Sequence, residues 1–149
     1  MEIERKYLVD IAKWEDLKKP EPVKIVQAYL SVDPKKTVRI RIKGDKGFVT
    51  IKGETIGFTR SEYEYEIPLK DAEEMIVKFA TRIIEKDRYC IKVVDHIWEI
   101  DVFHGKLAGL VLAEIELKAE DEEFIKPLWL TKEVSHDKNY FNSNLIQRC

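Results

Sequence analysis

The amino-acid sequence predicts an α+β protein built mainly from antiparallel strands, with about eight strands and few helices. Apolar and charged residues alternate over most of the 149-residue chain, as in strands with one buried face. The sequence GDKG at 44–47, between two such segments, is typical of a hairpin turn. No linker or fixed repeat divides the chain. We therefore expect a single domain over 1–149, either an antiparallel α+β fold or a barrel.

The first half of the chain is predicted to consist of strands interrupted by one helix. Residues 2–9 form the first strand, because Ile3 and Tyr7 alternate with charged residues. Residues 10–19 form a short amphipathic helix with Trp14 and Leu17 on one side, ended by Pro20. Further alternating segments are predicted strands, at 23–32, 37–44, 48–53 and 61–69.

The second half contains one predicted helix, a long hairpin, a further strand and two more helices. Asp71 followed by Glu74 predicts a helix start before 73–80, and 81–105 predict a hairpin that turns near 94–96. Residues 111–118 favour a strand, although Ala, Leu and Glu also suit a helix. A helix is expected from 119–124. A last helix is expected from Ser135 or Asp137, with packing residues Tyr140, Leu145 and Ile146.

Composition excludes several function classes. Lys and Arg number 26 against 28 Asp and Glu, a net charge of -2, so no global field favours nucleic acid or a membrane surface. No apolar run approaches the ~20 residues of a membrane span, and the charged start does not resemble a signal peptide. We expect a cytoplasmic protein. Cys90 and Cys149 lack metal-site spacing and are expected to be free thiols.

The charges are sorted by sign along the predicted strands. Acidic and basic pairs occur at a spacing of two residues, which places each pair on one strand face. The acidic pairs are Glu2 with Glu4, Glu62 with Glu64, Glu99 with Asp101, and Glu114 with Glu116; the basic pairs are Arg39 with Arg41 and Lys86 with Arg88, joined by Lys6 and Lys52. A solvated surface explains any one pair. Together, the pairs favour a closed sheet whose charged faces meet around a polyanion and its cations.

At these residues the sequence resembles the CYTH superfamily, also called triphosphate tunnel metalloenzymes. The N-terminal pattern ExExK is present as Glu2, Glu4 and Lys6, and the other sorted charges follow in the family's order along nearly the whole chain. The resemblance implies an eight-stranded antiparallel β-barrel, or tunnel, with a few helices packed outside. The start EIERK and the sequence QAYL resemble the short bacterial inorganic triphosphatases, in which a C-terminal helix similar to 135–145 plugs one tunnel mouth.

The resemblance implies metal-dependent hydrolysis of tripolyphosphate to pyrophosphate and phosphate, with Mg²⁺ or Mn²⁺ as cofactor. Class IV adenylate cyclase, thiamine or nucleoside triphosphatase, and a non-catalytic polyphosphate-binding module remain alternatives, since a shared fold does not choose the substrate. A purely structural barrel whose charges face water is a further alternative. The expected partner is a small polyanion, with no nucleic acid or membrane and a possible homodimer.

Roles for the charged residues follow from phosphoryl-transfer chemistry, which is mainly positioning and charge neutralisation. Candidate catalytic residues are Arg41, Lys52 and Lys86. Candidate substrate-binding residues are Lys6, Tyr29, Arg39, Arg41, Lys52, Lys86 and Arg88. Candidate metal ligands are Glu2, Glu4, Glu62, Glu64, Asp101, Glu114 and Glu116. Tyr29 is included because the resemblance implies a tyrosine facing the tunnel at this position; on spacing alone it equally suits core packing.

Histidines and tryptophans receive simpler predictions. His96, His104 and His136 have no metal-binding spacing and are expected at the surface or in turns. Packing roles beneath helices are expected for Trp14, Trp98 and Trp129.

Overall fold

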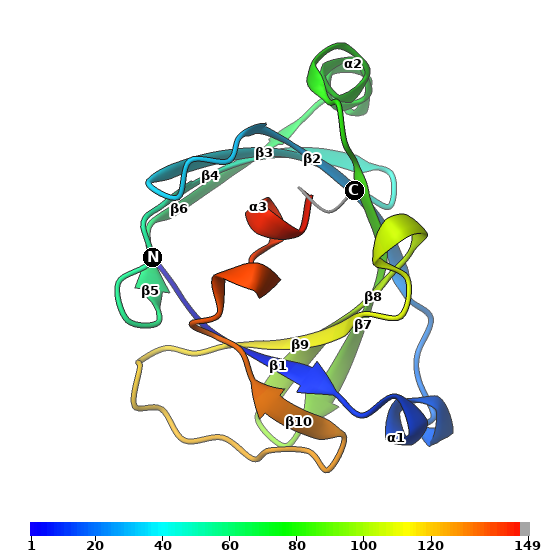
Figure 1. Ribbon diagram of the computed structural model, residues 1–149, viewed down its shortest axis with the longest axis vertical. Coiled ribbons are helices and arrows are strands. Elements are labelled where there is room, and N and C mark those ends of the chain that lie inside the picture. Colours follow the sequence, from blue (N-terminus) through cyan, green and yellow to red (C-terminus); the bar gives the residue numbers. More distant parts are fainter. Residues whose placement is uncertain (147–149) are drawn as a thin grey trace.

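The computed structural model describes residues 1–146 and shows a strongly curved antiparallel sheet wrapped around residues 137–146 (Figure 1). The strands are β1 (Glu2–Val9), β2 (Val23–Ser31), β3 (Lys36–Lys43), β4 (Lys46–Gly53), β5 (Thr59–Arg60), β6 (Glu62–Ile67), β7 (Ile84–Val93), β8 (His96–Phe103), β9 (Val111–Glu116) and β10 (Leu130–Glu133). The helices are α1 (Ile11–Asp16), α2 (Leu69–Phe79) and α3 (Asn142–Leu145), with 3₁₀ turns η1 (Gly105–Leu107) and η2 (Lys138–Tyr140).

Eight long strands form the wall, as predicted. The strand order is β10-β1-β9-β8-β7-β2-β3-β4-β6, and β6 does not pair with β1. The gap is bridged by β5, which directly precedes β6 and pairs with β1 at Glu2 opposite Arg60 and Ile3 opposite Thr59. The tunnel is therefore closed by a strand of two residues. The sequence did not predict β5 or β10, because two and four residues are too short to show a period.

The apolar faces of the strands point outward, where helices and a loop cover them. Over β3, the helix α2 packs Ala72 and Ile76 on Ile40 and Ala28. Its position outside the barrel is visible in Figure 1. This packing buries the apolar sides of β2 and β3 and leaves their charged sides to the interior.

A second apolar cluster lies outside β1, β8 and β9. Here the three tryptophans pack edge to face: the ring centroids of Trp98 and Trp129 are 5.9 Å apart, and those of Trp14 and Trp129 are 6.3 Å apart. Tyr7 adds a ring 5.7 Å from Trp98. The packing role predicted for the tryptophans is confirmed. Trp14 of α1 lies under a helix as expected, whereas Trp98 belongs to β8 and Trp129 to the loop before β10.

The last described turns, η2 and α3, lie inside the barrel (Figure 1). We call residues 137–146 the plug segment. Asp137 caps η2 by accepting a hydrogen bond from the Asn139 amide, which matches one of the two predicted caps. Leu145 and Ile146 pack against the inward-facing Ile84 and Leu112. The predicted final helix is therefore two short turns, and Cys149 lies outside the described residues.

The inward face of several strands changes from charged to apolar along its length. On β7 the buried Ile84 precedes Lys86, and on β9 Leu112 precedes Glu114. Because residues two apart share a strand face, the tunnel has a charged part and an apolar part. The plug segment packs on the apolar part, which explains why this end of the tunnel holds a helix.

One predicted helix is absent, and several predicted boundaries were wrong. The helix expected at 119–124 is a turn followed by extended chain, because the Glu122 carboxylate accepts a hydrogen bond from the Lys118 amide and pairs with His96. The predicted Asp71 start lies inside α2, whose first backbone bond runs from the Ala72 amide to the Pro68 carbonyl. The first helix stops at Asp16, and β9 stops at Glu116. Among residues 1–146, no helix is long and apolar enough to cross a membrane.

Candidate active site

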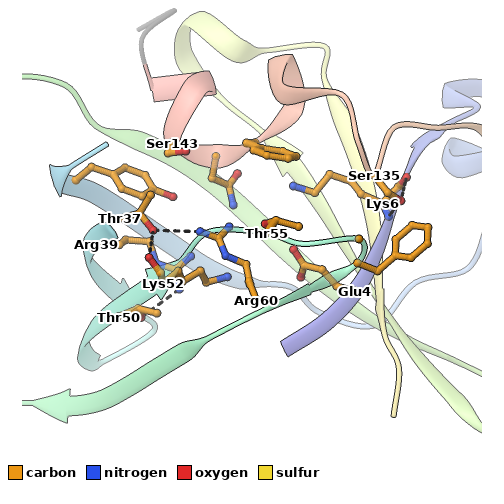
Figure 2. A pocket seen from close by; sticks show the side chains of 15 residues that line it. Glu4, Lys6, Thr37, Arg39, Thr50, Lys52, Thr55, Arg60, Ser135 and Ser143 are labelled. Carbon is orange, nitrogen blue, oxygen red and sulfur yellow. Dashed lines mark hydrogen bonds between the residues drawn. The ribbon is translucent and has the colours of Figure 1, made fainter. Parts of the chain in front are cut away.

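The charged part of the tunnel contains two adjoining cavities. The larger, the carboxylate chamber, has a volume of about 180 Å³, and its lining contains the following predicted site residues: Glu2, Glu4, Arg39, Arg41, Lys52, Glu62, Glu64, Arg88, Glu114 and Glu116. The smaller, the hydroxyl chamber, has a volume of about 50 Å³ and is lined by Lys6 and Tyr29 together with five Ser and Thr residues, Thr37, Thr50, Thr55, Ser135 and Ser143. Glu4, Arg39 and Lys52 line both chambers (Figure 2).

Lys52 and Arg39 form the boundary between the chambers. The Lys52 ammonium nitrogen lies 2.9 Å from a Glu2 carboxylate oxygen and 3.1 Å from a Glu62 oxygen. Arg39 donates a hydrogen bond of 3.2 Å to the Thr50 hydroxyl and lies 3.6 Å from Glu64. These cations are therefore neutralised by carboxylates in the absence of ligand. An entering polyanion would compete for them.

Arg41 has a different environment. Its guanidinium donates two hydrogen bonds, of 3.2 and 3.1 Å, to the side-chain oxygen of the fully buried Gln27. No carboxylate within residues 1–146 forms an ion pair with it. Burial, with the positive charges of Arg39 and Arg88, lowers the pKa of Arg41. A bound anion would relieve this unfavourable charge, so Arg41 is suited to hold phosphate oxygens.

Lys86, Arg88 and Asp101 form a buried triad. The Lys86 nitrogen lies 2.7 Å from one Asp101 oxygen, and Arg88 donates hydrogen bonds of 2.8 and 2.9 Å to the two oxygens. Burial raises the pKa of Asp101, but the two cations outweigh it and keep that pKa far below its usual range. Burial lowers the pKa of Lys86 to about 7, opposed by Asp101. Neither Lys86 nor Asp101 reaches the lining of the two chambers, so the structure groups Asp101 with cations rather than with the other predicted metal ligands.

Four glutamates come together on β1 and β9. In the antiparallel register Glu4 is opposite Glu116, and Lys6 is opposite Glu114 at an ammonium to carboxylate distance of 3.4 Å. Burial, followed by the charges of Glu114 and Glu2, raises the pKa of Glu4 to about 8. Burial and the same kind of repulsion also raise the pKa of Glu116. The folded chain thus holds carboxylates close together with too little positive charge nearby to neutralise them.

The donor set fits a hard divalent cation. Carboxylate oxygens are the protein ligands that Mg²⁺ and Mn²⁺ prefer, and the Glu4 carboxylate has no hydrogen bond or ion pair to any described residue. In the described part of the chain, no three His, Cys, Asp or Glu side chains already form a closed metal cage. A cation bound here would therefore use ligands from outside the chain as well, such as phosphate oxygens or water.

The sequence missed several residues of the site. Gln27 and Thr50 orient the two arginines, while Lys43 and Glu99 add to the lining of the carboxylate chamber. Asn142 of the plug segment lines both chambers, and its side-chain oxygen is buried without a hydrogen-bond partner in residues 1–146. Gln27 lies two residues before Tyr29, and this spacing could have indicated that both side chains share one face of the strand. Lys43 and Glu99 lie two residues from Arg41 and Asp101, so the charge pattern pointed to them as well. Thr50 and Asn142 are neutral and carry no sign pattern, so charge sorting could not find them.

The histidines lie away from the two chambers. His96 pairs with Glu122, and His104 lies 2.9 Å from an Asp87 carboxylate oxygen. His136 stacks on the Phe58 ring, with 4.5 Å between the centroids. Tyr29 lines the hydroxyl chamber and also packs against the cluster around Leu145, so both of its predicted environments are present.

Known proteins resemble this chain along its whole length. A family model described as CYTH domain matches residues 1–149. An inorganic triphosphatase of Acetivibrio thermocellus is 43% identical over 147 residues, covering 98% of this chain and 93% of the relative. One of Nitrosomonas europaea is 38% identical over 149 residues, covering 97% and 95%. The crystal structure of the inorganic triphosphatase NE1496 superposes with a TM-score of 0.67 and 36% identity, covering 98% and 94%.

Proposed function

Because this chain belongs to the CYTH domain family, we propose that it hydrolyses inorganic triphosphate to pyrophosphate and phosphate inside the tunnel. The relatives named inorganic triphosphatase align with it over 93% and 95% of their own length. The observation that carries the proposal is the carboxylate chamber, in which basic and acidic side chains are sorted onto facing strands. Such a surface fits a polyanion together with its cations and fits few other ligands.

Substrate binding would exchange partners within the chamber. Phosphate oxygens would replace Glu2 and Glu62 around Lys52, and Glu64 beside Arg39. Arg41 would contribute a guanidinium that no carboxylate has to release. Lys6 and Arg88 would hold further oxygens, one from each side of the tunnel. Tyr29 would contact the substrate from the hydroxyl chamber, which it lines.

The carboxylates of the chamber are suited to hold Mg²⁺ or Mn²⁺, with Glu2, Glu4, Glu114 and Glu116 as the first set. Glu62 and Glu64 of the neighbouring strand β6 would form a second set, while Asp101 stays paired with its two cations. Such an ion neutralises phosphate charge and lowers the pKa of a bound water. The substrate would complete the coordination that the chain alone leaves open.

The chain's own contribution to the transition state is electrostatic. Charge that develops on the leaving oxygen would be stabilised by Arg41, Lys52 and Lys86, which belong to three different strands and are fixed by packing. Lys86 is fully buried, anchored by Asp101 and absent from the lining of both chambers, so it would act on the leaving oxygen at a distance, through its charge. A fixed cation needs no reorganisation when the bond breaks, and this is the physical source of the rate enhancement.

A substrate panel tests the proposal. Tripolyphosphate, ATP and thiamine triphosphate are incubated with the protein and Mg²⁺ or Mn²⁺, and the products are separated. We expect the highest kcat/KM for tripolyphosphate, with pyrophosphate and phosphate as products. Cyclic AMP formed from ATP would identify a cyclase instead. Tight binding of tripolyphosphate without phosphate release would identify a binding module.

A further inference from the structure

The hydroxyl chamber differs in charge from the carboxylate chamber. Glu4 is its one lining carboxylate, against four basic side chains, Lys6, Arg39, Lys52 and Arg60. In the carboxylate chamber, acidic side chains outnumber basic ones. The tunnel is therefore polarised along its length, with an end that suits cations and an end that suits anions.

Arg60 is the one basic residue of the hydroxyl chamber that no function has been assigned to. It belongs to β5 and lies directly opposite Glu2 of β1 in the antiparallel register. Partners in register share a sheet face, so both side chains point into the tunnel. Figure 2 shows the Arg60 side chain directed toward Thr37.

The contacts of Arg60 hold its guanidinium without neutralising it. Its Nε donates a 3.1 Å hydrogen bond to the Gly53 carbonyl, and one terminal nitrogen donates a longer bond, of 3.4 Å, to the Thr37 hydroxyl. Lys6, Arg39 and Lys52 each have a carboxylate partner, whereas no carboxylate of residues 1–146 pairs with Arg60. The second terminal nitrogen remains available to an anion.

The size of the chamber limits what that anion can be. A volume of about 50 Å³ holds only a few water-sized groups, since one water needs ~10–15 Å³ of such space. A phosphate group with its oxygens is of this size. Threonine and serine hydroxyls around it would donate further hydrogen bonds to the oxygens.

We infer that Arg60 is a substrate-binding residue that holds the terminal phosphate of the triphosphate lying farthest from the metal-binding carboxylates. This inference rests on the proposed function, because it assigns a direction to the same substrate in the same tunnel. One end of the triphosphate lies in the hydroxyl chamber on Arg60, and the other lies among the carboxylates. Arg39 and Lys52, which line both chambers, lie between these ends.

The test compares Arg60→Gln and Arg60→Lys with Lys78→Ala, which removes an exposed cation from α2 outside the barrel. In Arg60→Gln we expect the KM for tripolyphosphate to rise ~10-fold to ~100-fold, because the variant loses hydrogen bonds to a charged group. The kcat should fall much less. Arg60→Lys should recover part of the loss, because the charge remains but the forked geometry does not. The Kd for tripolyphosphate, measured by calorimetry in EDTA, should rise in the same order.

A second readout separates binding from damage to the site. The rise in melting temperature caused by Mg²⁺ alone should be the same in Arg60→Gln and wild type, because Arg60 does not line the carboxylate chamber. Values of KM and Kd within twofold of wild type in folded Arg60→Gln would overturn the inference while leaving the proposed function intact. Absence of hydrolysis by the wild type would overturn the proposed function, and the calorimetric comparison in EDTA would still decide whether Arg60 binds the anion.

Discussion

Glu4 and Glu116 are direct partners in the register of β1 and β9, so two carboxylates face each other on the inner wall of the tunnel. Burial and the charges of other glutamates, Glu114 and Glu2 in both cases, raise the pKa of each and disfavour its charged state. The folded chain maintains this arrangement although it costs stability, which is expected where a cation binds.

The first prediction concerns metal-dependent stability. A cation that binds only the folded chain stabilises it by ~2.7 kcal/mol at a hundredfold excess over its Kd. Mg²⁺ should raise the melting temperature of the wild type, and the double variant Glu4→Gln with Glu116→Gln should lose most of this shift and most of the activity. The control removes two exposed charges from α2, Glu73→Gln with Glu74→Gln. An unchanged Mg²⁺ shift in the tunnel variant would show that these glutamates do not bind the ion.

The second prediction concerns pH in the absence of metal. The pKa of Glu4 is about 8 in the folded chain against 4.5 as its ordinary value, and its neighbours are Glu2, Glu114, Lys6 and Lys52. Between these two pH values the folded state therefore holds a proton that the unfolded state has lost. The free energy of unfolding keeps the full contribution of Glu4 below pH 4.5 or so and loses it as the pH rises toward 8. In EDTA, Glu4→Gln should melt above the wild type at pH 8, and the two should melt closer together at pH 5. A difference that is constant with pH would contradict the assignment.

The third prediction concerns the basic side chains of the chamber. Arg41→Ala and Lys52→Ala should each lower kcat/KM for tripolyphosphate by at least ~10²-fold, because each removes a fixed positive charge from the developing transition state. Lys46→Ala, at the exposed end of the same hairpin, is the matched control. Circular dichroism should show that all three variants are folded. Near wild-type turnover in both tunnel variants would remove these residues from the site.

The fourth prediction concerns the plug segment. Leu145 is fully buried against Leu112 and Ile84, and truncating such a side chain typically costs ~2–5 kcal/mol. Leu145→Ala should therefore unfold at clearly lower denaturant concentration than the wild type. Leu128→Ala is the control, because that side chain is 86% exposed. Activity should also fall in Leu145→Ala, since the Tyr140 carbonyl in this segment accepts a hydrogen bond from Lys6. Equal stability of the two variants would show that the plug segment does not contribute to the folded state.

The strand pattern and the charged face of the tunnel were predictable because both follow from a period of two. Arg39 and Arg41 point inward and Ile40 packs outward under α2, as alternation requires. Closure of the barrel was harder to predict from the sequence, since it depends on the two residues of β5. The helix expected at 119–124 failed because side-chain hydrogen bonds of Glu122 satisfy the local backbone in a turn.

Ion pairing inside the tunnel could not be predicted from spacing. The sequence places Asp101 in an acidic pair, but the fold brings it between Lys86 and Arg88 of the neighbouring strand. Which cation meets which carboxylate depends on register between strands that are distant in sequence, and a pattern within one strand carries no information on register. The contacts of Arg60 were hidden for the same reason.

The position of β1 between β9 and β10 has a consequence for how the protein is made. Apart from the two residues of β5, its partners are residues 111–116 and 130–133, so most of its pairing requires the second half of the chain. Domains whose contacts span the whole chain fold slowly, and unpaired strand edges are exposed until folding is complete. Charged side chains at alternate positions disfavour pairing of an unpaired strand with another chain, and β1 has such residues at Glu2, Glu4 and Lys6. The glutamates and the lysine that line the tunnel thus also disfavour unwanted strand pairing before the tunnel has formed.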